Sequence, residues 1–474
     1  MTACKWILTL GLLSTVAFFM LCCEEAPSYQ FCENENDLVL PAPCDIARPA
    51  CQKAVFEATK CVNGSNMPMP PIRMITQAEH LAELEMPDAV TPTDSDMDSG
   101  IDDTQTILES NDTEAELDSS ADLAASPDDF WDETLRLLDL IEPERTRREA
   151  ITEDFSSSVL AYYSNRYQDV TIITGNISDS FEERMSTLAH EFTHAIQDYE
   201  IGLDEQFELY SYDDDILMAQ QNVIEGDASV RADFAFAVLS GIPVDEMYSR
   251  QYYLSNLAYR RRVVASQPSP YVFAKNLLPY ATGALYVIDT FENEGLGGIN
   301  RLREDFPTAS VYWMAGYDAS RLSTDDGSPS HFNLPLECAE ADAPNGYEIR
   351  HQDRMGAAML FAVLSSQSVA GVHDVELPWN LAIQWRSDAI RSYVAAEGDH
   401  ISVAWHLRMA TPEDAKQLTT MLRDRHPHAV VKRFGTEVIE FFANDPAVLP
   451  AWIRSYTCDL TRAQDTAPTE TQGR

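Results

Sequence analysis

Apolar residues recur at helical spacing through the middle of the chain, between about residues 130 and 340. Such stretches, ended by Gly, Pro or polar residues, predict helices. We expect helices at Ser178–Glu200, Asp215–Leu239, Asp245–Ser266 and Tyr280–Glu294, and the start of one at Leu135–Leu140. A β-branched run ended by Gly, Asp169–Gly175, predicts a strand directly before the Ser178 helix. The middle of the chain is therefore predicted to be mainly helical.

The pattern changes beyond Glu348, where alternating apolar and polar residues stand beside helical stretches. It predicts, in order, a helix, two strands, a second helix opened by Thr411 and Pro412, and a hairpin that turns at Gly435. Their expected bounds are Met355–Ser366, Asp388–Val394, His400–Met409, Pro412–Arg425 and Ala429–Phe442. The predicted fold class is thus α+β, with a mainly helical domain followed by a small C-terminal α+β unit.

The first residues are typical of an export signal. Lys5 precedes an apolar run, Ile7–Leu21, which suits the core of a signal peptide better than a spanning helix. Cys22 and Cys23 follow, and a cysteine at this place is characteristic of bacterial lipoproteins. The residues before it are not small, so lipidation and an uncleaved N-terminal anchor both stay open. We expect an exported protein, lipid-anchored in the cell envelope or secreted.

The charge balance is strongly acidic, with 77 acidic and 33 basic residues and a formal net charge of −44. Nucleic acids and anionic membrane surfaces would repel such a chain, so neither is an expected partner. Between Arg73 and Arg136 there is no Lys or Arg, and Met86–Asp129 is poor in aromatic residues. This composition predicts a disordered acidic linker. A helical patch near Ala54–Cys61 precedes it.

These changes in composition predict the organisation of the whole chain. We expect a signal at 1–23, a cysteine-bearing segment at 24–83, the acidic linker at 84–129, a catalytic domain at 130–340, the C-terminal α+β domain at 341–460 and a disordered tail at 461–474.

The cysteines favour an oxidising compartment. Three of the nine lie in the signal region, and the remaining six are Cys32, Cys44, Cys51, Cys61, Cys338 and Cys458. An even number in an exported chain predicts disulfides, with the first four pairing among themselves and the last two with each other. A cysteine metal site is the competing interpretation, but no Cys-x2-Cys pair is present.

The strongest chemical signal is His190-Glu191-Phe192-Thr193-His194 within a predicted helix. Residues four apart lie on one helical face, so His190 and His194 can bind the same zinc ion. Glu191 can then take a proton from a water that the metal activates as the water attacks a carbonyl. The strand directly before the helix is the order expected of a zincin, in which the strand lines the cleft.

A catalytic zinc site has a third protein ligand. After His194 the next histidine is His331, so no histidine stands at short spacing. Glu225 is the candidate, because it lies in the next predicted helix, which can fold back to the metal. Asp227, or else Asp198, is the candidate to hydrogen-bond a ligand imidazole and fix its tautomer. A solvent-facing Glu in an amphipathic helix is the alternative for Glu225.

The segments His-Glu-Phe-Thr-His-Ala-Ile-Gln-Asp from His190 and Ile-Glu-Gly-Asp-Ala from Ile224 resemble gluzincin metallopeptidases. They are more closely similar to a group of predicted bacterial lipoproteins that also carry Pro-Tyr-x-x-Gly, which Pro279–Gly283 matches, as does the Gly pair at 297–298. The resemblance covers about residues 180–310 well and the C-terminal unit loosely. It implies a zincin-like domain with His190, His194 and Glu225 as zinc ligands and Glu191 as base.

The chain departs from thermolysin-like enzymes in a longer gap to the third ligand. It also lacks an Asp three or four residues beyond that Glu. The resemblance therefore does not extend to substrate specificity.

Peptide hydrolysis also needs a group that stabilises the oxyanion. Tyr280, which follows Pro279 at a predicted helix start, is the candidate, and a buried tyrosine anchoring that helix is the alternative. The prediction is an extracytoplasmic zinc metallopeptidase with a peptide or protein substrate. The alternative is a catalytically inactive zinc-binding lipoprotein that acts as a binding or scaffold protein.

Overall fold

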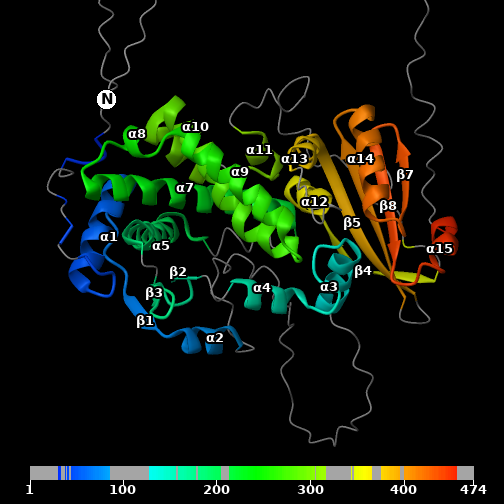
Figure 1. Ribbon diagram of the computed structural model, residues 1–474, viewed down its shortest axis with the longest axis horizontal. Coiled ribbons are helices and arrows are strands. Elements are labelled where there is room, and N and C mark those ends of the chain that lie inside the picture. The colour runs from blue at the N-terminus through cyan, green and yellow to red at the C-terminus, as the bar shows by residue number, and fades with distance from the viewer. Residues whose placement is uncertain are drawn as a thin grey trace, which may run out of the picture.

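The computed structural model describes residues 30–33, 38, 40–41, 44–85, 127–155, 159–177, 180–203, 213–304, 306–316, 343, 346–365, 375–395 and 400–455. Within them the chain is α+β, with a helical central region and a five-stranded sheet nearer the C-terminus (Figure 1). The predicted fold class is confirmed. The predicted signal and tail lie outside the described residues, as does the linker except where α2 (Gln77–Glu85) ends and α3 (Pro127–Leu137) begins. The domain boundaries stay a prediction.

Long helices form the central region, and their ends follow from local sequence signals. They are α5 (Phe181–Ile201), α7 (Asp214–Ser240), α9 (Arg250–Ser266) and α10 (Pro270–Glu304). Ser180 caps α5 by accepting a hydrogen bond from the Glu183 amide, and Gly202, at φ 67°, ends it in the left-handed region. Ser178, the first residue of the predicted helix, lies outside the described residues.

Three helix predictions are wrong in their bounds. The Asp245 helix is divided into α8 (Val244–Met247) and α9. The Tyr280 helix is part of the longer α10, which runs through Pro279 from Pro270 and is interrupted by non-helical backbone at Gly295. Leu135 lies near the end of α3, not at the start of a helix. Pro279 was assigned the wrong role, because α10 continues through it, whereas the predicted end at Glu294 coincides with the interruption at Gly295.

A small sheet lies against the central helices (Figure 1). Its strand order is β1 (Ile72–Ile75), β3 (Asp169–Ile173) and β2 (Ala161–Ser164), with β1 parallel and β2 antiparallel to β3. The predicted strand Asp169–Gly175 is confirmed as β3. It is the central strand, however, and residues beside and within β2 line the cleft described below, so the expectation that the predicted strand lines the cleft is wrong.

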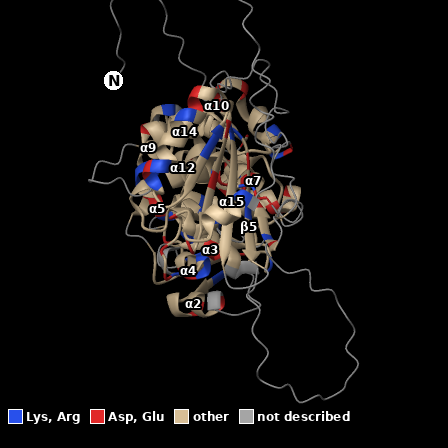
Figure 2. Cartoon of the chain, turned by 90° about the vertical axis from the view of Figure 1, so that its right-hand side faces the viewer, with Lys and Arg blue, Asp and Glu red and all other residues tan. Residues whose placement is uncertain are grey.

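The C-terminal part has one antiparallel sheet in the order β4 (Tyr347–Asp353), β5 (Trp385–Ala395), β6 (Ile401–Met409), β8 (Glu437–Ala443) and β7 (Val430–Phe434). The predicted strands and hairpin are confirmed, with Gly435 in the turn at φ 58°. The helix α14 (Pro412–Arg425) begins with a capping box of Thr411 and Asp414. The remaining helices are α4 (Arg147–Phe155), α11 (Val311–Ala315), α12 (Gly356–Ser365), α13 (Glu376–Ala382) and α15 (Leu449–Ser455). Figure 2 shows basic and acidic residues interspersed on this side of the molecule.

Buried charges join the start of α7 to the C-terminal part. The Asp215 amide donates to the Arg354 carbonyl at 3.0 Å, and the Arg354 guanidinium lies 2.9 Å from Asp213 Oδ2. Burial raises the pKa of Asp213 and of Asp215 to about 6, although Arg354 acts in the opposite direction. These contacts fix the start of the helix that carries Glu225.

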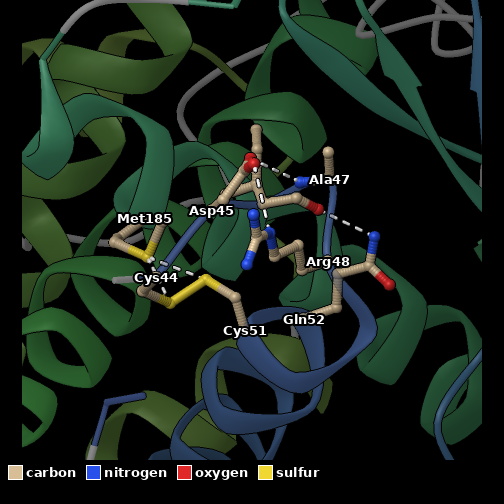
Figure 3. The surroundings of a disulfide bond; sticks show 8 residues. Cys44, Asp45, Ala47, Arg48, Cys51, Gln52 and Met185 are labelled. Carbon is tan, nitrogen blue, oxygen red and sulfur yellow. Dashed lines mark hydrogen bonds and ion pairs between the residues drawn. A yellow bond between two sulfur atoms is a disulfide. The ribbon is translucent and has the colours of Figure 1, made fainter. Parts of the chain in front are cut away.

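Two disulfides hold the N-terminal segment around α1 (Pro49–Asn63). Cys32 pairs with Cys61 and Cys44 with Cys51, so the prediction that the first four cysteines pair among themselves is confirmed. Cys44 Sγ lies 3.8 Å from Met185 Sδ on α5 (Figure 3). Disulfides indicate an oxidising compartment outside the cytoplasm. Cys338 and Cys458 lie outside the described residues.

Within the described ranges, no helix is both long and apolar enough to cross a membrane.

The backbones of α7 and α10 touch where two glycines meet. A Cβ on Gly226 would lie 2.2 Å from the Gly283 carbonyl carbon, and one on Gly283 would lie 2.0 Å from the Asn222 carbonyl oxygen. No side chain fits in either place. Because Gly226 follows Glu225 and Gly283 lies one turn after Tyr280, this crossing sets the distance between the helices that carry those two residues.

We expect Gly226→Ala to lower the free energy of unfolding by about 1–3 kcal/mol or more, because the added methyl group meets backbone that cannot yield. Urea denaturation measures this. Gly297→Ala is the control, since its Cβ would approach only the Arg301 guanidinium, at 4.0 Å. A stability for Gly226→Ala equal to that of the control would contradict the close crossing.

Candidate metal centre

Two neighbouring helices bring the predicted ligand atoms together. His190 and His194 come from one face of α5, and Glu225 comes from α7. Glu225 Oε2 lies 3.0 Å from His190 Nε2 and 3.5 Å from His194 Nε2, and the two Nε2 atoms are 2.8 Å apart. Ligand atoms around a tetrahedral zinc ion are about 3.3 Å apart. The three side chains are therefore arranged as one candidate metal site.

The chemistry of this group fits a bound cation. All three residues are buried, and the exposed fraction of Glu225 is 2%. Burial alone would raise the pKa of the Glu225 carboxyl, but the imidazoles of His194 and His190 outweigh it and lower the pKa to about 2. Its second oxygen, Oε1, has no hydrogen-bond partner among the described residues. A buried carboxylate oxygen without a donor is costly unless a cation lies beside it.

Glu191 lies beside the histidines on the cleft side of α5. Its Oε2 accepts a hydrogen bond of 2.9 Å from the Tyr163 amide in β2. This bond anchors the carboxylate to the edge of the small sheet. Glu191 is thus held in the wall of the cleft, next to His190 in the chain.

One cleft of about 690 Å³ opens onto the candidate metal site. Its walls come from one face each of α5, α9 and α10, from α7, and from the strand β2 with the residues before it. His190, Glu191 and Tyr280 all line it. A cleft of this volume accommodates several residues of an extended ligand. The candidate metal site therefore has access to a substrate-sized space.

Tyr280 lies inside α10, so its predicted place at a helix start is wrong. Its ring is stacked on the His190 ring, with centroids 5.4 Å apart and planes 16° apart. Tyr280 also lines the cleft, and it is therefore not merely a helix anchor within the core.

Neither of the two aspartates considered as partners of a ligand imidazole bonds one directly. Asp198 Oδ2 accepts a hydrogen bond from the Tyr163 hydroxyl at 2.8 Å, and Oδ1 accepts one from the Leu203 amide. The residue bonded to a ligand imidazole is Gln197, whose Oε1 lies 2.8 Å from His194 Nδ1. Asp227 bonds the Gln197 amide nitrogen at 2.9 Å. Asp227 is thus connected to the His194 imidazole through Gln197, whereas a direct bond to the imidazole was expected.

Gln197 was not singled out from the sequence. It stands three residues after His194, a spacing that places two residues on one face of a helix. That spacing was the available signal.

Asp233 of α7, which lines the cleft, is the second residue that the sequence did not reveal. It accepts a hydrogen bond from the Tyr253 hydroxyl at 2.9 Å. Burial raises the pKa of its carboxyl to about 7, and the negative charge of Glu182 adds to the rise. A carboxyl that changes charge near neutral pH therefore lies in the wall of the cleft.

No protein family matches the sequence, and no curated protein or solved structure is significantly similar to it. The class of site is therefore defined by its own geometry, a buried His-His-Glu group within reach of one metal ion.

We expect Asp233→Asn to flatten the dependence of stability on pH. The folded-state pKa lies above the ordinary value, so the stabilisation by this group is present at low pH and is lost as pH rises through about 7. Between roughly pH 6 and 8 the free energy of unfolding of the wild type should fall by about 1 kcal/mol more than that of the variant. Asn keeps an acceptor for Tyr253. Urea denaturation at the two pH values measures both free energies of unfolding. An equal change with pH in the wild type and the variant would contradict the prediction.

Proposed function

We propose that this protein is an extracytoplasmic zinc-dependent peptidase. The observation that carries the proposal is the convergence of His190, His194 and Glu225 beside a cleft that His190 and Glu191 line. A set of two imidazoles and one carboxylate suits zinc and leaves a fourth position for water or substrate. The substrate class is peptides or proteins.

A zinc ion in this site would supply a water that is activated near neutral pH and would polarise the scissile carbonyl. Glu191 is the general base: its carboxylate takes the proton of the attacking water and later passes it to the leaving amine. The bond from the Tyr163 amide fixes Glu191 Oε2 at the edge of the small sheet and so orients the carboxylate. The 2% exposure of Glu191 keeps bulk water from competing.

Tyr280 is the candidate for stabilising the oxyanion. Its ring lies against His190 on the cleft side, and a phenol donates a hydrogen bond without carrying charge at neutral pH. A hydrogen-bond donor at this position would stabilise the negative charge on the oxygen of the tetrahedral intermediate, a charge that the ground-state carbonyl lacks. We therefore expect the Tyr280 hydroxyl to increase the rate of the chemical step.

The disulfides of the N-terminal segment support a location outside the cytoplasm. The disulfides favour an exported chain, and Cys22 or Cys23 would carry the lipid if it is anchored in the cell envelope. Nucleic acid is not an expected partner, given the net charge of −44. The second candidate function is a zinc-binding scaffold without activity, which the same metal site would serve.

We expect Glu191→Gln to reduce peptide hydrolysis by roughly 10²- to 10⁴-fold, because the amide cannot take a proton, while zinc is retained. Cleavage of casein or a peptide library, with and without chelator, measures activity, and elemental analysis measures zinc. His190→Ala should lose both zinc binding and peptide hydrolysis.

Two outcomes would decide against the peptidase. Zinc bound by the wild type with no hydrolysis of any peptide would favour the scaffold function. Activity unaffected by Glu191→Gln would remove that residue from the mechanism.

We expect Tyr280→Phe to lower kcat by on the order of 10²- to 10³-fold with little change in KM, since the hydroxyl is needed chiefly in the transition state. Tyr286→Phe, on the same helix but packed against Trp313, is the matched control. Steady-state kinetics on one peptide substrate compares them. Equal kcat values for the two variants would show that the Tyr280 hydroxyl has no part in catalysis.

A further inference from the structure

We propose that Gln197 is a positioning residue for the metal ligand His194, and that a buried cluster of charges joined to the end of α1 holds its amide in place. This inference deepens the proposed function, since it rests on the same metal site. It does not require the protein to hydrolyse peptides.

The orientation of the Gln197 amide is fixed by its partners. Its Nε2 donates to the Ile224 carbonyl at 3.0 Å and to Asp227 Oδ2 at 2.9 Å. Both partners are acceptors, so the amide nitrogen must face them and Oε1 must face away. Oε1 then lies 2.8 Å from His194 Nδ1. The Gln197 side chain is fully buried, and no water competes for either end.

This orientation dictates the tautomer of His194. An amide oxygen only accepts hydrogen bonds, so His194 Nδ1 must carry the hydrogen. In the neutral ring, Nε2 is then left with a lone pair, and it is Nε2 that faces His190 and Glu225. The tautomer suited to binding a metal is therefore set before any metal arrives. In the other tautomer, His194 Nδ1 and Gln197 Oε1 would be two buried acceptors facing each other with no hydrogen between them.

Asp227 is itself held by two buried guanidinium groups. Arg231 Nε donates to Asp227 Oδ1 at 2.7 Å, and Arg303 Nε donates to Oδ2 at 2.7 Å. Arg303 also pairs with Glu200 at 2.9 Å. Two positive and two negative charges thus balance, with Glu200 at the exposed edge of the cluster, and this offsets the cost of burying Asp227, Arg231 and Arg303. Asp227 has no freedom to turn away from Gln197.

The two arginines donate hydrogen bonds to the last residues of α1. Arg231 Nη1 donates to the Val62 carbonyl at 2.6 Å, and Arg303 Nη2 donates to Asn63 Oδ1 at 2.7 Å. The disulfide of Cys32 with Cys61 closes directly before these residues. A continuous series of buried hydrogen bonds therefore runs from the disulfide-bonded segment to one nitrogen of a metal ligand. The segment at 44–63 belongs to the support of the metal site.

We expect Gln197→Met to raise the dissociation constant for zinc by roughly 10- to 100-fold, because Nδ1–H is left buried without an acceptor. The measurement is competition of the full chain with a chelator for zinc. Gln220→Met is the matched control, since neither amide atom of buried Gln220 has a hydrogen-bond partner among the described residues. Gln197→Asn, whose amide is too short to reach Nδ1, should weaken binding likewise and serves if the methionine variant does not fold.

A second measurement separates this inference from the proposed function. Nitrogen NMR of ¹⁵N-histidine-labelled, metal-free protein should find His194 with its hydrogen on Nδ1 in the wild type and in Gln220→Met, and a mixture of tautomers in Gln197→Met. Zinc affinity within about twofold of the control together with an unchanged tautomer would overturn the inference. A wild type that binds zinc tightly but hydrolyses nothing would overturn the peptidase and leave the role of Gln197 intact.

Discussion

The contact between α7 and α10 at Gly226 and Gly283 is the constraint on which the site depends. Glycine at both positions lets two helix backbones approach to a distance that any side chain would prevent. Glu225 precedes one glycine, and Tyr280 lies one turn before the other. The same crossing therefore delivers a candidate metal ligand and a candidate oxyanion donor to one cleft. It also gives a physical reason for the glycine in Ile-Glu-Gly-Asp-Ala, from Ile224, and for the one that ends Pro279–Gly283.

Around this crossing, the protein buries charges that a core normally excludes. Each is placed where another charge or a set of donors compensates it. Glu225 faces two imidazoles, and Asp227 faces Arg231 and Arg303. Breaking one partner of such a buried set costs more than the set contributes, so the network favours one arrangement over its alternatives. The metal site gains rigidity from it, because side chains packed in a balanced cluster have few other low-energy positions.

The sequence predicted what local rules determine. His190 and His194 face one point because the helix period places residues four apart on one face, and Glu225 followed because it stands in the next helix. Gln197 and Asp233 were missed because their importance depends on which side chain lies opposite, which is a tertiary property. Pro279 was taken as the start of a helix, although α10 passes through it. The four-residue strand β1 escaped detection because it is short and pairs with β3, about a hundred residues further along the chain.

The pairing of β1 with β3 has a consequence for proteolytic processing. The segment before residue 86 contributes a strand to the small sheet, and its helix α1 accepts hydrogen bonds from Arg231 and Arg303. A protease that cut the chain between α2 and α3 would leave both pieces held by these buried bonds. The product would be a two-chain molecule in which the candidate metal site is intact. The N-terminal piece is thus a poor candidate for a removable inhibitor, since its loss would remove β1 from the small sheet and the acceptors of Arg231 and Arg303.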